Sequence, residues 1–240
     1  MAPTHRLTTH HSAPLAPDRS ERTRGRLLEA AGAVFSERGL RAATVRQICS
    51  RADANIAAVC YHFGSKEELY SAVLVEAYRA ALAKYPPLLG TSESAPAEAR
   101  LHAFVHSLLL RILDQDNASC FGSLILREFA EPTPALATVV EQTFRPIYQL
   151  LTSIVAEILA EAAGKRPVPP RVAHRCAASV LGQCLFYKHT KPISERLTPH
   201  LRFERGALAE LADHITKFSL AGIHEEARRA AKGAAPRRAK

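Results

Sequence analysis

Residues 44–63, TVRQICSRADANIAAVCYHF, decide the fold, because they encode two short helices separated by a tight turn. Thr44 and Gln47 have the spacing of a capping box, in which the hydroxyl accepts from a backbone amide and the glutamine side chain reaches back. Asp53 supplies the turn, since Asp tolerates the left-handed conformation better than most residues. Asn55 is a favoured N-cap residue for the second helix. The segment therefore predicts a helix-turn-helix motif.

The second helix of this pair, residues 56–63, has an apolar face and an outward face. Small alanines let a helix approach base edges in the DNA major groove, where an alanine methyl group can contact a thymine methyl group. Tyrosine and histidine side chains can donate to phosphates. The pattern predicts a helix that reads DNA. We expect Ile56, Val59, Cys60 and Phe63 to face the core, and Ala57, Ala58, Tyr61 and His62 to face outward.

The flanking residues complete the predicted interface. Ser65 and Glu68 form a second capping box, which opens a helix through about Lys84. Lys66 lies at the start of that helix, where its positive charge and the exposed backbone amides both favour binding of a phosphate. Thr44 and Arg46, which precede the turn, are placed to contact the DNA backbone from the other side. The predicted DNA-binding set is Thr44, Arg46, Asn55, Ala57, Ala58, Tyr61, His62 and Lys66.

The segments on either side of this motif also have helical periodicity. A helix from Arg22 ends at Gly39, where a residue without a Cβ adopts the left-handed conformation easily. No segment alternates apolar and polar residues as a strand does, so we predict an all-α fold. Further helices are expected at 99–115, 118–130, 134–162, 171–189 and 205–224, with Pro146 kinking the third and a break from Gly164 to Pro170. The expected divisions are an arm (1–21), a helix-turn-helix domain (22–70), a helical domain (71–227) and a basic tail (228–240).

The net charge of the chain is concentrated at one end, so it indicates less about the binding partner than its size suggests. The chain carries 32 Lys and Arg against 23 Asp and Glu, a net charge of +9, which favours an anionic partner. The tail alone contributes +6, whereas residues 24–70 contribute only +2. The tail can therefore touch phosphates without reading sequence, or serve only to keep the chain in solution.

Cysteine and hydropathy patterns indicate the compartment. The five cysteines form no C-x-x-C pair, which argues against a disulfide framework and a zinc site. Cys49 and Cys60 lie on apolar helix faces, so we expect both to be buried. No run of 18 apolar residues and no signal-peptide pattern is present. The sequence favours a cytoplasmic protein without cofactor or metal.

The run from Arg24 to Tyr70 resembles the DNA-binding domain of the TetR family of transcriptional regulators. The shared markers are AA-x-x-x-F-x-x-x-G, T-V-x-x-I and the YHF-x-SKEEL junction. Asp53 departs from the glycine that the family usually has in the turn. The resemblance implies a homodimer that binds a palindromic operator through its N-terminal helices, and whose C-terminal helices form a ligand pocket and a dimer interface.

The C-terminal part resembles one subgroup of that family. CFGSLILREFAEPTPAL, FRPIYQLL and SVLGQCLFYKHTKPISERL are similar to the YbiH/CecR-like subgroup, whose C-terminal domain is of the DUF1956 type. This implies repression, often of neighbouring transport or efflux genes, relieved by a small hydrophobic or drug-like effector.

Ligand sites in helical bundles lie between facing helices, so polar residues on apolar stripes are the candidates. His102 and His106 can equally be a surface pair, and a thiol sensor using Cys120, Cys176 and Cys184 is a weaker alternative. The candidate effector-binding residues are His102, His106, Arg111, Glu128, Gln183, Cys184 and Tyr187.

Small residues beside leucines in the last two helices predict a four-helix dimer interface, although the same stripe can pack within one subunit. The candidate interface residues are Ala178, Leu181, Leu185, Leu208, Leu211 and Ile215.

Two other classes of protein compete with a regulator. A non-specific or architectural nucleic-acid binder would use the basic tail. An enzyme has no support, because no nucleophile elbow, glycine-rich phosphate loop or paired carboxylates occur.

Overall fold

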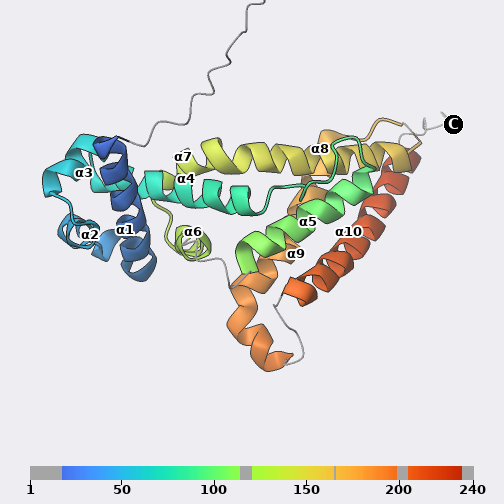
Figure 1. Ribbon diagram of the computed structural model, residues 1–240. Coiled ribbons are helices and arrows are strands. Elements are labelled where there is room, and N and C mark those ends of the chain that lie inside the picture. The colour runs from blue at the N-terminus through green and yellow to red at the C-terminus, as the bar shows by residue number, and fades with distance from the viewer. Residues whose placement is uncertain (1–17, 114–120, 165, 199–204, 234–240) are drawn as a thin grey trace, which may run out of the picture.

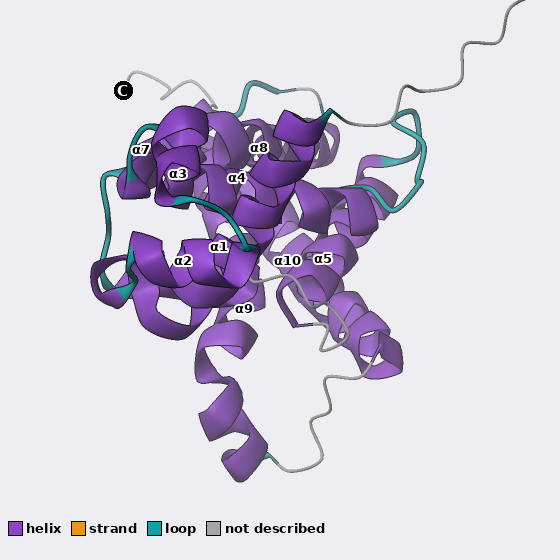
Figure 2. Ribbon diagram, turned by 60° about the vertical axis from the view of Figure 1, so that its left-hand side comes forward, coloured by secondary structure: helices purple, strands orange, loops and turns teal. Residues whose placement is uncertain are grey.

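The computed structural model describes residues 18–113, 121–164, 166–198 and 205–233. Within these ranges every regular element is a helix, which confirms the all-α prediction (Figures 1 and 2). No described helix combines the length and the apolar character that crossing a lipid bilayer requires. The elements are α1 (Arg19–Ala42), α2 (Val45–Ala52), α3 (Ile56–Phe63), α4 (Lys66–Lys84), α5 (Ala97–Leu113), α6 (Phe121–Ala130), α7 (Ala135–Val139), a π-helical turn η1 (Val140–Phe144), α8 (Arg145–Ala162), α9 (Pro170–Leu197) and α10 (Arg205–Gly233).

The helices form two packed regions joined by α4. Helices α1–α3 gather at one end of the molecule, which we call the head, and α4 runs from the head into a body built mainly from α5, α8, α9 and α10 (Figure 1). The core of the head includes Leu27, Phe35 and Ile48 together with Leu69 and Leu74 from α4. Helix α4 therefore continues through the domain boundary expected after residue 70.

Local sequence chemistry explains where most helices begin and end. Gly39 interrupts α1 with φ 73° and ψ 174°, a conformation that favours glycine, so the predicted stop is a kink within a helix that continues to Ala42. Pro146 lies in the first turn of α8, and the helix expected over 134–162 is interrupted just before it by the π-helical turn η1. Gly164, with φ 63°, follows the end of α8 as predicted.

The last two helices are longer than the periodicity predicts. Helix α9 continues to Leu197 with Pro192 inside it, and its end projects from the body in Figure 1. Helix α10 continues to Gly233 and so includes the first part of the predicted basic tail. There Arg228 and Arg229 pair with Glu225 one turn earlier, at 2.6 and 2.9 Å, because i,i+3 and i,i+4 side chains meet on a helix. The predicted arm up to residue 17 and the tail beyond 233 lie outside the described residues.

Candidate nucleic-acid interface and effector core

The two helices of the predicted motif are fixed by their caps. Thr44 Oγ1 accepts from the Gln47 amide at 3.3 Å and the Gln47 side chain accepts from the Thr44 amide at 3.0 Å, which completes the capping box. Asp53 adopts the left-handed conformation, with φ 46° and ψ 56°. Asn55 Oδ1 accepts from the Ala57 amide at 3.0 Å. These predictions are confirmed, and the side-chain acceptor of Asn55 is used within the protein.

The outward face of α3 differs in part from the predicted one. Tyr61 is 80% exposed and Ala57 is exposed, whereas Ala58 and His62 are half-buried. Ile56, at 48%, and Cys60 are exposed, so their predicted burial is wrong. The reason is geometric: α3 is only eight residues long and packs against α1, α2 and α4 through a narrow stripe centred on Val59. The exposed face is therefore more apolar than expected.

A basic hollow lies beside the N-terminus of α2. It encloses about 630 Å³ and is lined by Thr44, Arg46 and Ser50 together with Arg38 and Arg51. Arg46 is exposed, while Arg51 donates to Glu37 at 3.3 Å. Glu37 also lines the hollow and pairs with Arg51, which lies in the last turn of α2, so Arg38 and Arg46 provide the positive charge that suits a phosphate group near the start of this helix.

Lys66 has a contact that the sequence does not reveal. Its ammonium group donates to the carbonyl oxygens of Leu40, at 2.9 Å, and Ala43, at 3.1 Å. It thereby ties the start of α4 to the chain that follows the kink in α1. Ser65 Oγ accepts from the Glu68 amide, at 3.0 Å, but the reciprocal bond of a capping box does not form, so only half of that prediction holds.

The seven predicted effector residues do not form one cluster. Glu128, fully buried on α6, accepts from the Tyr70 hydroxyl at 2.8 Å and from the Thr133 amide at 3.1 Å. Nearby, Arg127 donates to the carbonyls of Ser36 and Glu37 near the end of α1. Glu128 thus belongs to the contact between head and α6, and its carboxylate is already occupied by protein donors.

A second group lies in the body. Arg111 on α5 is only 3% exposed, and burial lowers the pKa of its guanidinium group. It interacts with Tyr78 of α4 and, electrostatically, with Cys184 of α9. Burial also raises the pKa of the Cys184 thiol to about 12, which opposes thiolate formation and disfavours a thiol sensor at this residue.

The remaining candidates lie at helix contacts. His102 Nε2 lies 2.8 Å from Asp213 Oδ1 but without hydrogen-bond geometry. His106 is half-buried, and its pKa is lowered first by burial and then by the neighbouring His102. Gln183 donates to Ser219 Oγ at 3.0 Å, which joins α9 to α10. Tyr187 is half-buried and stacks edge-on against Phe186.

The predicted dimer residues separate into two groups. Leu208, Leu211 and Ile215 are buried in the core of the subunit, so their prediction as a free interface needs correction: they pack within one chain. Ala178 is exposed, and Leu181 and Leu185 are half-buried. The exposed face of α9 and α10 instead carries a hollow of about 520 Å³, whose lining includes Phe218, 67% exposed.

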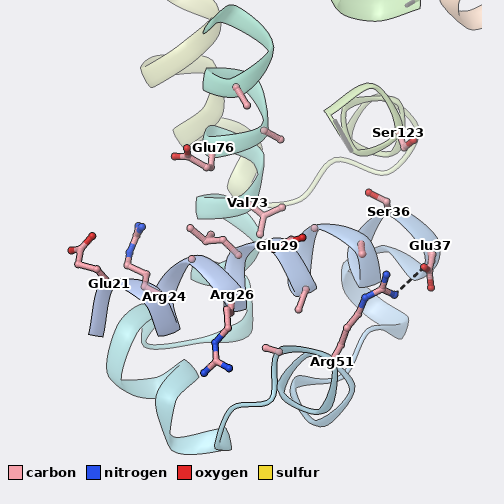
Figure 3. Close-up of a pocket in the computed structure, with 18 residues that line it drawn as sticks. Glu21, Arg24, Arg26, Glu29, Ser36, Glu37, Arg51, Val73, Glu76 and Ser123 are labelled. Atoms are coloured by element: carbon pink, nitrogen blue, oxygen red, sulfur yellow. Dashed lines mark hydrogen bonds and ion pairs between the residues drawn. The ribbon is translucent and has the colours of Figure 1, made fainter. Parts of the chain in front are cut away.

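A larger hollow lies on the side of the head rather than in the body. Figure 3 shows it between α1, α2, α4 and α6, with Arg24, Arg26 and Glu76 among its charged lining residues. It encloses about 1100 Å³. None of the seven predicted effector residues lines it. Its alternating charges are typical of a solvated surface, and we assign it no role.

A capped helix-turn-helix head carried by a separate helical body defines a DNA-binding regulator. Residues 27–73 match the family model described as bacterial regulatory proteins, tetR family, and residues 97–223 match the C-terminal domain of the HTH-type transcriptional dual regulator CecR. The chain belongs to the TetR family of transcriptional regulators, in the CecR-like subgroup, and is a non-enzymatic DNA-binding protein.

Individual relatives agree with this assignment. The chain is 33% identical to the dual regulator CecR of Shigella flexneri over 151 residues, which cover 60% of this chain and 67% of that protein. It is 31% identical to the repressor KstR2 of Mycolicibacterium smegmatis over 126 residues, covering 50% and 61%. A crystal structure of a transcriptional regulator from Pseudomonas aeruginosa PAO1 has the same fold, with a TM-score of 0.64 at 20% identity, covering 86% of this chain and 93% of that one.

Proposed function

We propose that this regulator is a cytoplasmic homodimeric repressor that binds a palindromic operator and is released by a small effector. The observation that carries the DNA-binding mode is the outward face of α3, which is held by the Asn55 cap and places an 80% exposed Tyr61 beside exposed Ala57. The ring of Tyr61 packs edge-on against that of His62, and at 80% exposure the side chain is available to a phosphate.

In this mode α3 enters the major groove. Tyr61 and His62 contact phosphates, while Ala57 and the edge of Ala58 lie against base edges, together with Asn55. Thr44 and Arg46, at the basic hollow of α2, hold the DNA backbone on the other side. Lys66 contributes its charge from the start of α4, although two of its donors are used by carbonyls of the head.

The exposed face of α9 and α10 supports the dimer. Phe218, at 67% exposed, and Phe186, at 55%, are large apolar side chains whose exposure is relieved by association. Two helices from each subunit would form a four-helix interface, with Ala178 allowing close approach, and this arrangement carries two heads to two half-sites.

The DNA-binding mode is tested by selecting duplexes from a random pool and footprinting the preferred sequence. Tyr61→Phe should weaken binding to all duplexes alike, whereas Ala57→Ser or Ala58→Ser should change the preferred sequence. Tyr148→Phe is the matched control, since the hydroxyl of Tyr148 contacts the His174 carbonyl in the body. Protection that is indifferent to sequence, or unchanged affinity in Tyr61→Phe, would reject the docking.

The dimer is tested by light scattering. Phe218→Asp should produce monomers that no longer protect a palindrome, and Phe129→Asp, the same substitution at a 46% exposed position of α6, should leave the dimer intact. Monomeric wild-type protein, or a dimer that survives Phe218→Asp, contradicts the proposed interface.

A sequence-blind nucleic-acid binder using the basic tail is the alternative. The contacts in the helical part of the tail argue against this alternative, because Arg228 and Arg229 are paired with acidic residues of α10. The two mechanisms are separated by the slope of log K against log salt for selected and random DNA, measured with and without residues 228–240. Equal slopes and complete loss of affinity on truncation would favour the tail.

A further inference from the structure

Helix α3 itself carries none of the charged or amide side chains that usually read base pairs. Its sequence, IAAVCYHF, contains no arginine, lysine, asparagine or glutamine and no carboxylate. Those are the groups that recognise guanine, adenine or cytosine by hydrogen bonds in the major groove. The exposed residues of α3 are Ile56 (48%), Ala57, Cys60 and Tyr61 (80%). The exposed face of α3 is therefore mostly apolar.

The amide side chain that precedes α3 is committed to the protein. Asn55 Oδ1 accepts from the Ala57 backbone amide at 3.0 Å, which is the N-cap bond of the helix. A bidentate contact with adenine uses both the oxygen and the amino group of an asparagine. The cap holds the oxygen of Asn55 against the first turn, so the amino group is the part of this amide left for DNA. A single donor of this kind can serve a phosphate or several base acceptors alike, so it discriminates poorly between base pairs.

Position along α3 separates the residues that can reach base pairs from those that suit phosphates. In helix-turn-helix complexes, the N-terminal residues of the helix in the major groove contact base edges. Ile56 is the first residue of α3, and Cys60 follows it by about one turn on the same side. Tyr61 lies in the second half of the helix, edge-on against the half-buried His62, and both can donate to phosphates. Ile56, Ala57 and Cys60 are thus the exposed side chains left for the base pairs.

We propose that this regulator reads its operator mainly through the C5-methyl groups of thymine, with Ile56, Ala57 and Cys60 as the contacting residues. The inference rests on the proposed function, in which α3 enters the major groove. Among the four bases only thymine presents a methyl group there, and apolar side chains recognise it by contact. This contact also removes the half-exposed Ile56 side chain from water. The operator class is therefore a pair of half-sites with T·A pairs under the N-terminal half of α3.

The charged groups of the head supply affinity rather than sequence information in this arrangement. Arg38 and Arg46 line the basic hollow near the start of α2, and Lys66 donates to two carbonyls of the head. Contacts with phosphates position a protein on the duplex but carry no sequence information directly. The two kinds of residue should therefore have separable effects. Arg46→Ala should weaken binding to all duplexes alike, whereas Ile56→Ala should reduce the preference for the selected sequence.

The first experiment removes single methyl groups from the DNA and leaves the protein unchanged. The duplex that wild type prefers in the random selection is remade with 2′-deoxyuridine in place of one thymine at a time, which keeps the base pair and its hydrogen-bonding groups. At least one such duplex for each half-site should bind about fourfold more weakly, the value expected for one buried methyl group. Thymines outside the footprint are the internal control and should give no change. If no replacement weakens binding by more than about twofold, the proposal is overturned.

The second experiment places the methyl group on a different base. A T·A pair found sensitive to uridine is replaced by a C·G pair and by a pair of 5-methylcytosine with guanine. These two pairs have the same hydrogen-bonding groups and differ only in the C5-methyl group. The methylated pair should bind about fourfold more tightly than C·G. Equal affinity for the two pairs would show that hydrogen-bonding groups of the base are read instead, and would overturn the proposal.

Variants of the protein assign the methyl contact to its residue. Ile56→Ala should lose the uridine penalty at one position of each half-site and keep it at any other sensitive position. Ile193→Ala is the matched control, because Ile193 is 59% exposed on α9 in the body, and it should keep every penalty. Cys60→Ala gives a second, independent variant with a smaller change in side-chain volume. Uridine penalties that stay at the wild-type value in both head variants would contradict the assignment.

These measurements distinguish failure of this inference from failure of the proposed function. A preferred sequence whose binding is insensitive to thymine methyl groups rejects the methyl readout alone and leaves the operator-binding regulator standing. The absence of any preferred sequence rejects both. A regulator that binds a selected half-site as a monomer contradicts the proposed dimer, while the uridine series still decides how the half-site is read.

Discussion

The buried bond between Tyr70 and Glu128 gives the sharpest stability prediction, because it joins the head to α6. The Tyr70 hydroxyl, in a side chain only 1% exposed, donates at 2.8 Å to a carboxylate that is fully buried. A hydrogen bond to a charged group contributes about 1.5–3 kcal/mol. Tyr70→Phe removes this donor and leaves the carboxylate with the two donors of Thr133.

For a chain of this length, about 1 kcal/mol corresponds to a shift in melting temperature of about 2–4 °C. Tyr70→Phe should therefore lower the melting temperature by about 3–12 °C in scanning calorimetry. The control is Tyr148→Phe, whose hydroxyl contacts the His174 carbonyl at 3.3 Å on the surface. That change should stay within about 0.5 kcal/mol, or about 2 °C.

A double-mutant cycle with Glu128→Gln tests whether the bond is the cause. Since the two residues are in contact, their effects should be non-additive by about 0.5–3 kcal/mol. Glu128→Gln also places an amide beside the Thr133 N–H donor, so it should destabilise at least as strongly as Tyr70→Phe. Additive effects, or equal shifts in Tyr70→Phe and Tyr148→Phe, would refute the reasoning.

Three further predictions concern the head and the body. Gly39→Ala should lower the free energy of unfolding in urea by about 1–3 kcal/mol, because φ 73° with ψ 174° is a conformation essentially reserved for glycine. Lys66→Met should lower both the stability, by about 1 kcal/mol for each bond lost, and the DNA affinity, whereas Tyr61→Phe should lower only the affinity in a gel shift. The pKa of His106 is held below its ordinary value, so the unfolded chain binds more protons, and the stability that neutral His106 contributes is lost as the pH falls below about 6.5. His106→Asn should flatten that decline in a melting series from pH 7.5 to pH 5, while His174→Asn should not.

The sequence predicted those features of the fold whose chemistry is local. The caps at Thr44 and Asn55 and the turn at Asp53 depend on residues at most four positions apart, and all three formed as expected. The contacts of Lys66 with Leu40 and Ala43 join residues 26 and 23 positions apart, so no local pattern reveals them.

The candidate site was predicted less completely, for two physical reasons. Helical periodicity assigns faces but not the width of the buried stripe, so it predicts burial of Ile56 and Cys60, whereas Val59 is the only fully buried residue of α3 and Ala58 and Phe63 pack against the core at its edge. A polar residue on an apolar stripe satisfies its buried polar atoms either with protein or with ligand. Glu128 uses protein donors, and only knowledge of the packing separates it from Arg111, whose Nη2 has no hydrogen-bond partner among the described residues.

Helix α4 connects the two halves of the molecule through two tyrosines. Tyr70 binds Glu128 near the head and Tyr78 meets Arg111 in the body. Tyr78 follows Tyr70 by eight positions, which corresponds to about 12 Å along a helix, and both lie in a helix that begins three residues after α3 ends. A packed helix moves as a unit rather than bending continuously, so a displacement at Tyr78 reaches the start of α4. Because Lys66 ties that start to the carbonyls after the kink in α1, we expect such a displacement to be passed from α4 to the head.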